Sequence, residues 1–456
     1  MKDLDVLVIG AGTAGQTVAY DLADEGLSVG VVDMSDRPGG VCALAGCQAK
    51  KWFYEATETV ARATHLLGKG VTRLPETDWG SILAEKNRFT EGIPESTVQG
   101  FKAAGIDYLK GRAAFTDPNT VAVDGKVISA QRIVIASGAR PMPLPLDGVE
   151  HVITSDAFLD LPSLPERIAF IGGGFISFEF AHFAARLGAR AGDIHILEIA
   201  DRPLGPFDEE MVALLVKAGE AEGIRVHTGV TIDGVTAGGE AKTLHLASGE
   251  TIDVGLVVHG AGRVPNIEGL GLTTAGITAT RGGITVDSGM KTSNPRVWAV
   301  GDCADTVQLA RVADQEAHVA AAGITAEIQG EDGPAMDYRG VPFMLFTYPQ
   351  YAMVGRTEAS LRNEGVRYWK SMGSGLTWPT YRRIGMQHAA YKILVDDKNR
   401  ILGAHILSDN AAGLINTFKQ AMLSGTTAED LYHSQVMSPY PTRESDIIYM
   451  LSPLIE

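Results

Sequence analysis

Two cysteines with four residues between them, Cys42 and Cys47, are the side chains of this sequence best suited to redox chemistry. The stretch from Gln48 to His65 contains neither proline nor glycine and predicts a helix with Cys47 at its N-terminus. A helix N-terminus favours a thiolate, and Lys51 follows Cys47 by four residues, on the same helix face. We interpret the pair as a redox-active disulfide; two buried structural thiols, with Lys51 a solvated surface lysine, are the alternative.

The composition of the chain limits its function. With 456 residues it is too long for one core, and its net charge of −16 argues against binding to nucleic acid. The third cysteine, Cys303, is predicted to be a buried structural thiol, and three cysteines suit neither a disulfide framework nor a zinc site. No apolar run reaches the roughly 18 residues of a membrane span, and no signal peptide is visible, so a cytoplasmic location is expected.

A glycine-rich turn follows the first predicted strand, Val6 to Ile9, and opens a helix expected from Gln16 to Glu25. Such a turn lets the backbone approach a pyrophosphate at a helix N-terminus. Asp33 ends the next strand and is placed to accept hydrogen bonds from ribose hydroxyls. The features together predict a dinucleotide-binding βαβ unit. The glycines of its turn are Gly10, Gly12 and Gly15.

A second unit of the same kind begins with the strand Ile168 to Ile171. Its turn contains Gly172 and Gly174, with Ser177 where a third glycine would stand. Glu198 ends its second strand, and an acid there favours the free 2′-hydroxyl of NAD(H) over the phosphate of NADP(H). A solvated strand-end carboxylate is the alternative for Glu198.

Three further polar segments follow predicted strands, and a cofactor could contact them there. Asp302 is well placed for the polyol of a cofactor, because it ends the buried run Val297 to Val300. From Tyr338 the composition changes to antiparallel strands with helices between them, which predicts a further domain. The three segments contain Ser137 and Gly138, Gly262 and Arg263, and Gly301 and Asp302.

These motifs, in this order, resemble the flavin disulfide reductases, the class I pyridine nucleotide-disulfide oxidoreductases, and the pattern is most similar to dihydrolipoamide dehydrogenase. The resemblance covers nearly the whole chain and includes Gly39 to Lys51, Ala136 to Gly138, Gly172 to Glu179, Gly262 to Asn266, Gly301-Asp302, and Phe346 to Glu358.

The resemblance implies an α/β protein with two Rossmann-like dinucleotide-binding domains, for FAD and NAD, and a C-terminal α+β dimerisation domain. The expected division is residues 1–145 for the first part of the FAD domain, 146–265 for the NAD domain, 266–335 for the rest of the FAD domain and 336–456 for dimerisation.

The resemblance also implies roles for individual residues. Cys42 would attack an external disulfide, and Cys47 would be the thiolate packed against the flavin. Lys51 and Glu179 would pair near the flavin and the nicotinamide, whose pocket Phe175 would gate. The other cofactor-binding residues would be Gly10, Gly12, Gly15, Asp33, Gly40, Ser137, Gly138, Gly172, Gly174, Glu198, Gly262, Arg263, Gly301 and Asp302.

The substrate side departs from the family pattern. The usual acid–base histidine is replaced by Tyr440, the glutamate five residues later is Ser445, and Glu444 stands one position early. The cysteine motif also departs, with Val41, Leu44, Ala49 and Lys50 at positions usually occupied by Thr, Asn, Pro and Ser. A phenol with a pKa near 10 is a poor base at neutral pH, at a cost of about 10²- to 10⁴-fold in rate. His433, seven residues away from Tyr440, is a weaker candidate for the base.

Three hypotheses follow. The first is a homodimeric, FAD- and NADH-dependent oxidoreductase acting on a lipoyl or other disulfide, with Tyr440 and Glu444 in the altered substrate site. The second is an NAD(P)H oxidoreductase that reduces a metal ion, a quinone or another acceptor, as a mercuric reductase or a transhydrogenase does. The third is a flavoprotein subunit or redox sensor docked to a partner.

Overall fold

The computed structural model describes residues 4–189, 191–239 and 241–455. Contacts divide the chain into two compact units. The first comprises Met1–Trp52, Ala84–Met142 and Arg263–Tyr338, and the second comprises Phe53–Leu83, Pro143–Gly262 and Arg339–Glu456.

The first unit is built on a five-stranded parallel sheet. Its strands are short apolar runs because both faces of a parallel sheet are covered. In order across the sheet they are β18 (Val297–Ala299), β7 (Ala130–Ile135), β1 (Leu4–Ile9), β2 (Val29–Asp33) and β3 (Asp107–Lys110).

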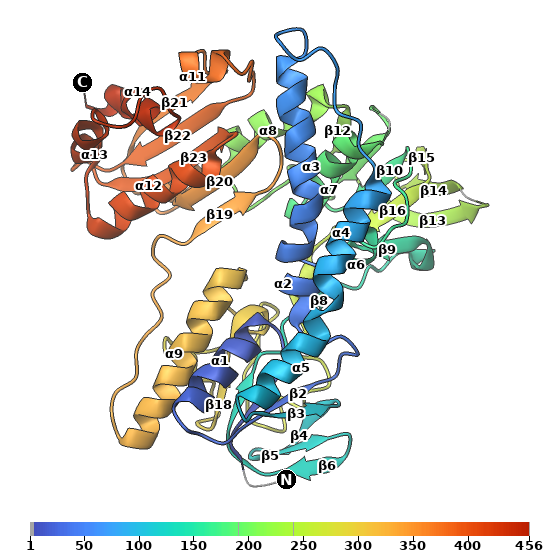
Figure 1. The fold of residues 1–456 in the computed structure, drawn as a ribbon, viewed down its shortest axis with the longest axis vertical. Helices are drawn as coiled ribbons and strands as arrows, with labels where there is room; N and C mark the ends of the chain where they lie inside the picture. Colours follow the sequence, from blue (N-terminus) through green and yellow to red (C-terminus); the bar gives the residue numbers. More distant parts are fainter. Residues whose placement is uncertain (1–3, 190, 240, 456) are drawn as a thin grey trace. The chain divides into compact units, whose positions relative to one another are not determined.

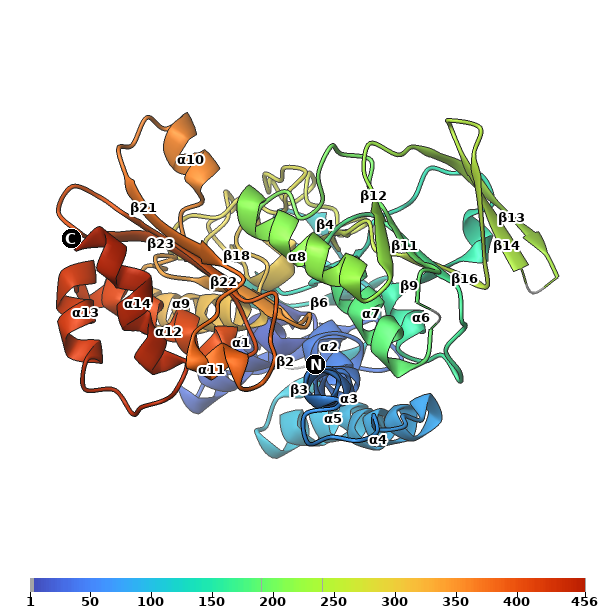
Figure 2. The ribbon, with the colours of Figure 1, turned by 90° about the horizontal axis from the view of Figure 1, so that it is seen from above.

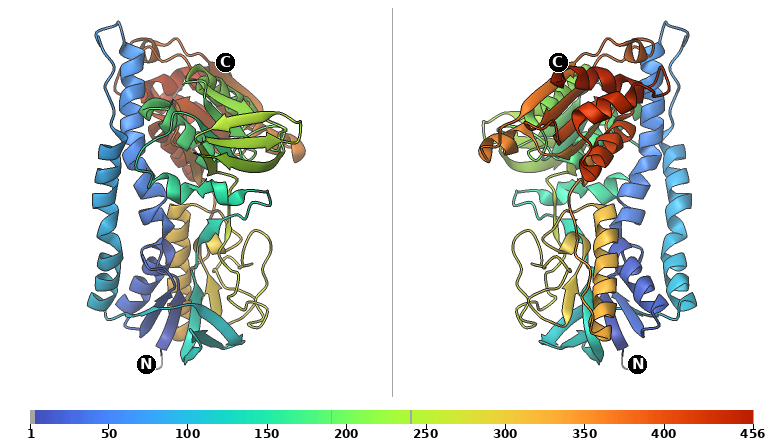
Figure 3. Two further views of the ribbon diagram at one scale, coloured as in Figure 1. Left: turned by 90° about the vertical axis from the view of Figure 1, so that its right-hand side faces the viewer. Right: turned by 90° about the vertical axis from the view of Figure 1, so that its left-hand side faces the viewer.

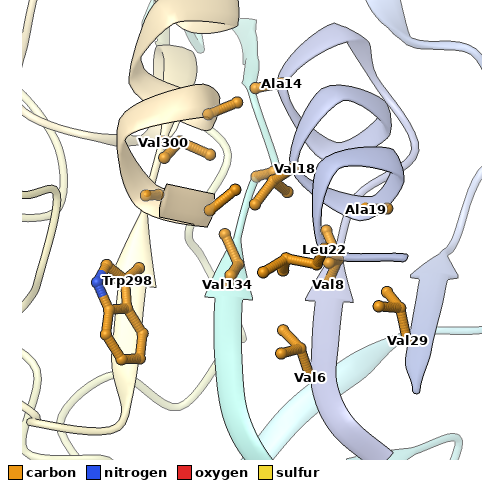
Figure 4. Close-up of a cluster of buried hydrophobic side chains, with 14 of the residues drawn as sticks. Val6, Val8, Ala14, Val18, Ala19, Leu22, Val29, Val134, Trp298 and Val300 are labelled. Carbon is orange, nitrogen blue, oxygen red and sulfur yellow. The ribbon is translucent and has the colours of Figure 1, made fainter. Parts of the chain in front are cut away.

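Two helices, α1 (Thr13–Asp24) and α9 (Ala310–Gln329), pack against each other beside this sheet (Figure 3). Val18 and Leu22 of α1 belong to the same buried cluster as Val8 and Val134 of the strands (Figure 4). The remaining elements of the unit surround this core. They are α2 (Gly40–Leu44), the start of α3 (Cys47–Leu66), most of α4 (Trp79–Glu91), α5 (Ile93–Ala103), the antiparallel sheet of β4 (Ala113–Asp117), β5 (Thr120–Val123) and β6 (Lys126–Ile128), the pair β8 (Ala139–Pro141) and β17 (Arg263–Pro265), and η2 (Gly301–Cys303).

The second unit contains another five-stranded parallel sheet, and the chain between two of its strands forms a three-stranded antiparallel sheet (Figure 1). The parallel order is β12 (Ile224–His227), β11 (Ile194–Leu197), β10 (Ile168–Ile171), β16 (Leu256–His259) and β9 (Val152–Thr154). The antiparallel strands are β13 (Ile232–Gly238), β14 (Ala241–Leu246) and β15 (Thr251–Val254), and the helical segments are η1 (Val149–His151), α6 (Ser155–Phe158), α7 (Phe175–Leu187) and α8 (Glu209–Ala221).

The same unit ends in a five-stranded antiparallel sheet, on which helices of this region pack (Figure 2). Its order is β19 (Pro342–Leu345), β20 (Gln350–Gly355), β23 (Ile401–Ser408), β22 (Ala390–Val395) and β21 (Trp369–Ser374). The helical segments of this region are α10 (Glu358–Asn363), α11 (Pro379–Arg382), α12 (Ala411–Ser424), α13 (Ala428–Gln435), η3 (Glu444–Asp446), α14 (Ile447–Leu451) and η4 (Ser452–Leu454).

The fold class predicted from the sequence is confirmed: two parallel βαβ sheets precede an α+β region. Some predicted boundaries were wrong, and the first strand begins at Leu4 and not at Val6. The first helix begins at Thr13 and not at Gln16, because the glycine turn itself forms the first helical turn, with Gly12 as its N-cap. The four-part domain division stays a prediction.

Candidate active site: a thiol pair and two dinucleotide turns

The structure brings the side chains of Cys42 and Cys47 together. Cys42 lies in the short helix α2, and Cys47 is the first residue of α3, as the sequence predicted. Both are reduced, with no disulfide between them. A hydrogen bond with Cys47, together with burial, raises the pKa of Cys42 well above that of an ordinary thiol. In the reduced pair Cys42 therefore keeps its proton, and it needs a base before it can attack a disulfide.

The turn after β1 is closely packed against the segment before Cys42. A Cβ atom on Gly40 would lie 2.4 Å from Gly12 Cα, and one on Gly10 would lie 2.2 Å from Ala136 O. A Cβ atom on Gly12 would meet only ordinary contact, 3.5 Å from Gly40 Cα. Gly10 and Gly40 are therefore required by the fold, whereas Gly12 leaves space that a side chain would fill.

The open space at Gly12 fits a dinucleotide phosphate. Gly12 is the N-cap of α1 and makes no side-chain capping hydrogen bond, so the first amides of the helix point towards that space. α7 begins in the same way, with Gly174 as its N-cap and no side-chain cap. Backbone amides at a helix N-terminus are what a pyrophosphate requires, so both turns fit the predicted cofactors.

The carboxylate of Asp33 holds the first turn in shape. Asp33 Oδ2 accepts a hydrogen bond of 2.7 Å from the backbone N–H of Ala11, and its Oδ1 accepts one of 2.7 Å from Ser35 N–H. Each carboxylate oxygen has a further lone pair with which it could accept from a ribose hydroxyl.

Glu198 makes the matching pair of bonds in the second turn. Its Oε2 accepts from Gly173 N–H at 2.6 Å, and its Oε1 accepts from Ala200 N–H at 2.8 Å. The structure also explains Ser177, which occupies the third glycine position. A glycine at position 177 would usually let the helix pack closely on the strand. Here Gly260, which follows the facing strand, makes the room instead, because a Cβ atom on it would lie 1.9 Å from Ser177 Oγ.

Glu179 lies on α7 and is almost completely buried. Its Oε1 accepts a hydrogen bond of 2.9 Å from Phe346 N–H, so the residue is fixed by the segment that follows β19. Phe175, one helical turn earlier, is exposed. Lys51 belongs to the other unit, so its pairing with Glu179 stays a prediction.

Polar residues at the strand ends of the first unit gather around Asp302. Burial raises the pKa of this carboxyl, and the nearby cation of Arg263 partly opposes the shift. Arg263 in turn donates to Ala139 O at 2.9 Å, which ties it to the segment containing Ser137 and Gly138. Cys303 is fully buried and donates to Ile135 O at 3.3 Å, as expected for a structural thiol.

Glu316 is a buried acid that the sequence reasoning missed. It lies on α9, accepts from Gly301 N–H at 2.7 Å and from the hydroxyl of Tyr338 at 2.7 Å, and so fixes the turn before Asp302. The sequence could have indicated Glu316, because it is a carboxylate on the otherwise apolar, buried face of the helix.

On the substrate side, Tyr440 is 71% exposed. Glu444 is engaged elsewhere, because its Oε1 accepts a hydrogen bond of 2.7 Å from Asn410 Nδ2. Ser445, which replaces the usual glutamate, donates from Oγ to Thr442 O at 2.7 Å. The side chains of Glu444 and Ser445 thus make hydrogen bonds that stabilise this region of the chain. The acid–base role predicted for Tyr440 and Glu444 stays a prediction.

Comparison with known proteins decides the family. Residues 4–317 match the model of the family described as "Pyridine nucleotide-disulphide oxidoreductase", and residues 341–448 match that of its dimerisation domain. The chain belongs to the pyridine nucleotide-disulphide oxidoreductases. The predicted FAD-containing, NAD(P)H-using class of enzyme is therefore confirmed, and the C-terminal region is its dimerisation domain.

Relatives of this oxidoreductase have different names. A glutathione reductase of Burkholderia cepacia is 32% identical over 98% of both chains. A dihydrolipoyl dehydrogenase of Cupriavidus necator is 31% identical, covering 97% of this chain and 96% of that one. A solved structure of the HOCl-induced flavoprotein disulfide reductase RclA from Escherichia coli has a TM-score of 0.88 over 100% of both chains at 24% identity, which shows a shared fold.

Two negative findings concern the residues that the structure describes. Among them, no group of three or more histidine, cysteine, aspartate or glutamate side chains is arranged to hold a metal ion. None of the helices in the described ranges is both long and apolar enough to cross a membrane.

Proposed function

We propose that this chain is an NADH-dependent flavoprotein disulfide oxidoreductase whose electrons pass through Cys42 and Cys47. The observation that carries the proposal is the hydrogen-bonded thiol pair, which follows Gly40 where that residue packs against the dinucleotide turn at Gly12. Bound FAD supplies two-electron transfer between the nicotinamide and this pair. NADH and one proton thus convert the disulfide into two thiols, and exchange with a substrate disulfide restores it.

The preference for NADH rests on the end of β11. Glu198 carries a negative charge where the adenosine ribose is expected, and the 2′-phosphate of NADPH would be repelled there. Ile199, the next residue, is 71% exposed and offers no cation. The cytoplasm, where NADH is available, is the location that suits this reaction.

The substrate we infer is a disulfide, lipoyl or of another kind, bound by a homodimer in which Tyr440 and Glu444 complete the partner's site. The dimerisation domain supports the dimer. Because Tyr440 is a poor base and the pKa of Cys42 is raised, we expect slow turnover with a disulfide whose thiols leave reluctantly.

Thiol titration of the purified holoenzyme tests the proposal. Anaerobic addition of NADH should expose two additional thiols that react with Ellman's reagent, and Cys42→Ser or Cys47→Ser should abolish this gain. Cys303→Ser is the matched control and should leave it unchanged. An identical NADH-dependent gain in the Cys47→Ser variant would sink the proposal.

A second candidate function is reduction of an acceptor that needs no acid–base group, such as a quinone or a metal ion. The observation in its favour is that Glu444 is bonded to Asn410 and not to Tyr440. A screen of acceptors with NADH separates the two functions, because this candidate requires a fast acceptor whose rate survives Cys42→Ser. If the protein reduces none of the acceptors and co-purifies with a stable partner, the sensor or subunit hypothesis is favoured.

A further inference from the structure

Two histidines on adjacent strands of the second unit make direct contact. His195 lies on β11 and His227 on the neighbouring edge strand β12, in a register that pairs His227 with Leu197. His195 Nδ1 and His227 Nε2 are 3.0 Å apart, and the two rings are inclined by 16°. Neither residue has a part in the proposed function.

The separation of these two nitrogens suits a metal ion as well as a hydrogen bond. Imidazole nitrogens bind Zn²⁺ at about 2.0–2.1 Å, so two of them on one ion lie about 2.8–3.4 Å apart for ligand angles between roughly 90° and 110°. The observed 3.0 Å is within that range. We propose that His195 and His227 form a two-imidazole site for a borderline divalent cation such as Cu²⁺, Ni²⁺ or Zn²⁺, with water completing the coordination.

The two rings are held in position before any ion arrives. His195 shares the sheet face of Leu197, which packs under β13 and β14, and is only 8% exposed. His227 is half-buried on the edge strand, so part of this residue contacts solvent. A pair fixed by the sheet loses little conformational freedom when it chelates an ion.

The ionisation state of the pair also favours binding. Burial lowers the pKa of His195 to about 4, and burial lowers that of His227 as well, so both rings are neutral at pH 7. The cation of Arg225 repels any positive charge placed at the two rings, including that of a metal ion. Asp193 near His195 and Glu250 near His227 attract such a charge. The proton now shared between the rings moves to a distal ring nitrogen, so binding releases no net proton.

The site would be coupled to the acid of the second dinucleotide turn. Glu198 N–H donates to His227 O at 2.8 Å, and Val230 N–H donates to Glu198 O at 2.9 Å. A cation that clamps β11 to β12 therefore stiffens the backbone from which the Glu198 side chain extends.

Metal titration of the oxidised holoenzyme tests this site, because the disulfide form removes the cysteine thiolates as competing ligands. Cu²⁺ alone, followed by calorimetry at pH 7, should bind at one site per chain, more tightly than Ni²⁺ or Zn²⁺. His195→Gln and His227→Gln should each weaken Cu²⁺ binding at least tenfold. The exposed His318, changed to Gln, is the control and should leave the affinity unchanged.

Electron paramagnetic resonance of the Cu²⁺ complex gives a readout that does not depend on either variant. Two imidazole nitrogens should be coupled to the copper in the wild-type protein. The proposal is overturned if fewer than two are coupled, if no Cu²⁺ binds, or if both histidine variants bind it with wild-type affinity. The outcome is independent of the proposed function, since no turnover is measured.

Discussion

The ammonium nitrogen of Lys392 lies 2.6 Å from Oδ1 of Asp208, and both side chains are almost completely buried. Glu358 lies 3.0 Å from the same nitrogen. Asp208 also caps α8, accepting from Met211 N–H at 3.3 Å, and accepts from Glu358 N–H at 3.3 Å. One buried lysine thus joins the start of α8 to β22 and α10 of the dimerisation region.

Replacing Lys392 with methionine should destabilise the protein. Asp208 would lose its buried cation, whereas Glu358 would keep its pairs with Lys370 and Arg362. Breaking a buried ion pair costs about 3–5 kcal/mol. The measurement is the urea concentration at the unfolding midpoint. Lys398→Met, at an exposed position six residues later, is the control and should shift the midpoint little. Equal midpoints for the two variants would contradict the structure.

The same cluster should make stability fall in acid. Burial alone would raise the pKa values of Asp208 and Glu358, but the hydrogen bonds of Lys392 and its neighbours hold both below their ordinary values. Carboxylates with lowered pKa stabilise the fold above about pH 4, and the stabilisation is lost as pH falls through their folded pKa values. Melting temperatures between pH 2.5 and 7 should fall more steeply for wild type than for Lys392→Met. Parallel curves would show that the cluster contributes nothing.

Substitutions at Gly12 and Gly40 should have different effects, with Gly12→Ala impairing FAD binding and Gly40→Ala impairing folding. Gly40→Ala places a Cβ atom 2.4 Å from Gly12 Cα at a positive φ of 80°, so it should lower the melting temperature markedly. Gly12→Ala meets only an ordinary contact and should fold normally. It should nevertheless purify with less FAD, because its methyl group occupies the space expected for the pyrophosphate. The flavin-to-protein absorbance ratio and the melting curve of each variant check this, and full flavin content in Gly12→Ala would place the phosphates elsewhere.

Tyr440→His should accelerate lipoamide turnover with NADH. An imidazole can accept a proton at neutral pH, and a general base contributes about 10²–10⁴-fold. We expect the lower end of that range, because Glu444 remains bonded to Asn410 and cannot orient the new ring. Tyr440→Phe removes only the phenolic hydroxyl. A lower lipoamide rate in this variant would show that the hydroxyl takes part in the reaction, and an unchanged rate would show that the side chain only fills space. An unchanged lipoamide rate in Tyr440→His would remove the main argument for a lipoyl substrate.

The sequence predicted the two dinucleotide units well, for a physical reason. Strands buried on both faces, such as Ile168 to Ile171, must be continuously apolar, and glycine is required where Gly10 touches Ala136. Local chemistry therefore marks these elements directly. The position of the thiol pair could be predicted for the same reason, because the residues after Cys47 predict a helix that begins at this cysteine.

The ion cluster around Lys392 and the histidine pair were not predictable in this way. Asp208 and Lys392 are 184 residues apart, and neither differs in type from the many charged residues on the surface. Only the packing of α8 against β22 removes them from water. The pairing of His195 with His227 likewise depends on the register of two strands, which a single sequence does not specify.

The hydrogen bonds that Asp33 and Glu198 make to their own turns have a consequence for redesigning coenzyme choice. Each carboxylate shapes its loop through backbone amides, in addition to the predicted role of accepting from a ribose. Exchanging Glu198 for arginine to recruit NADPH would add a cation and leave the N–H of Gly173 without its present acceptor. A successful redesign must therefore leave an acceptor for that N–H and supply the positive charge from a neighbouring position such as Ile199.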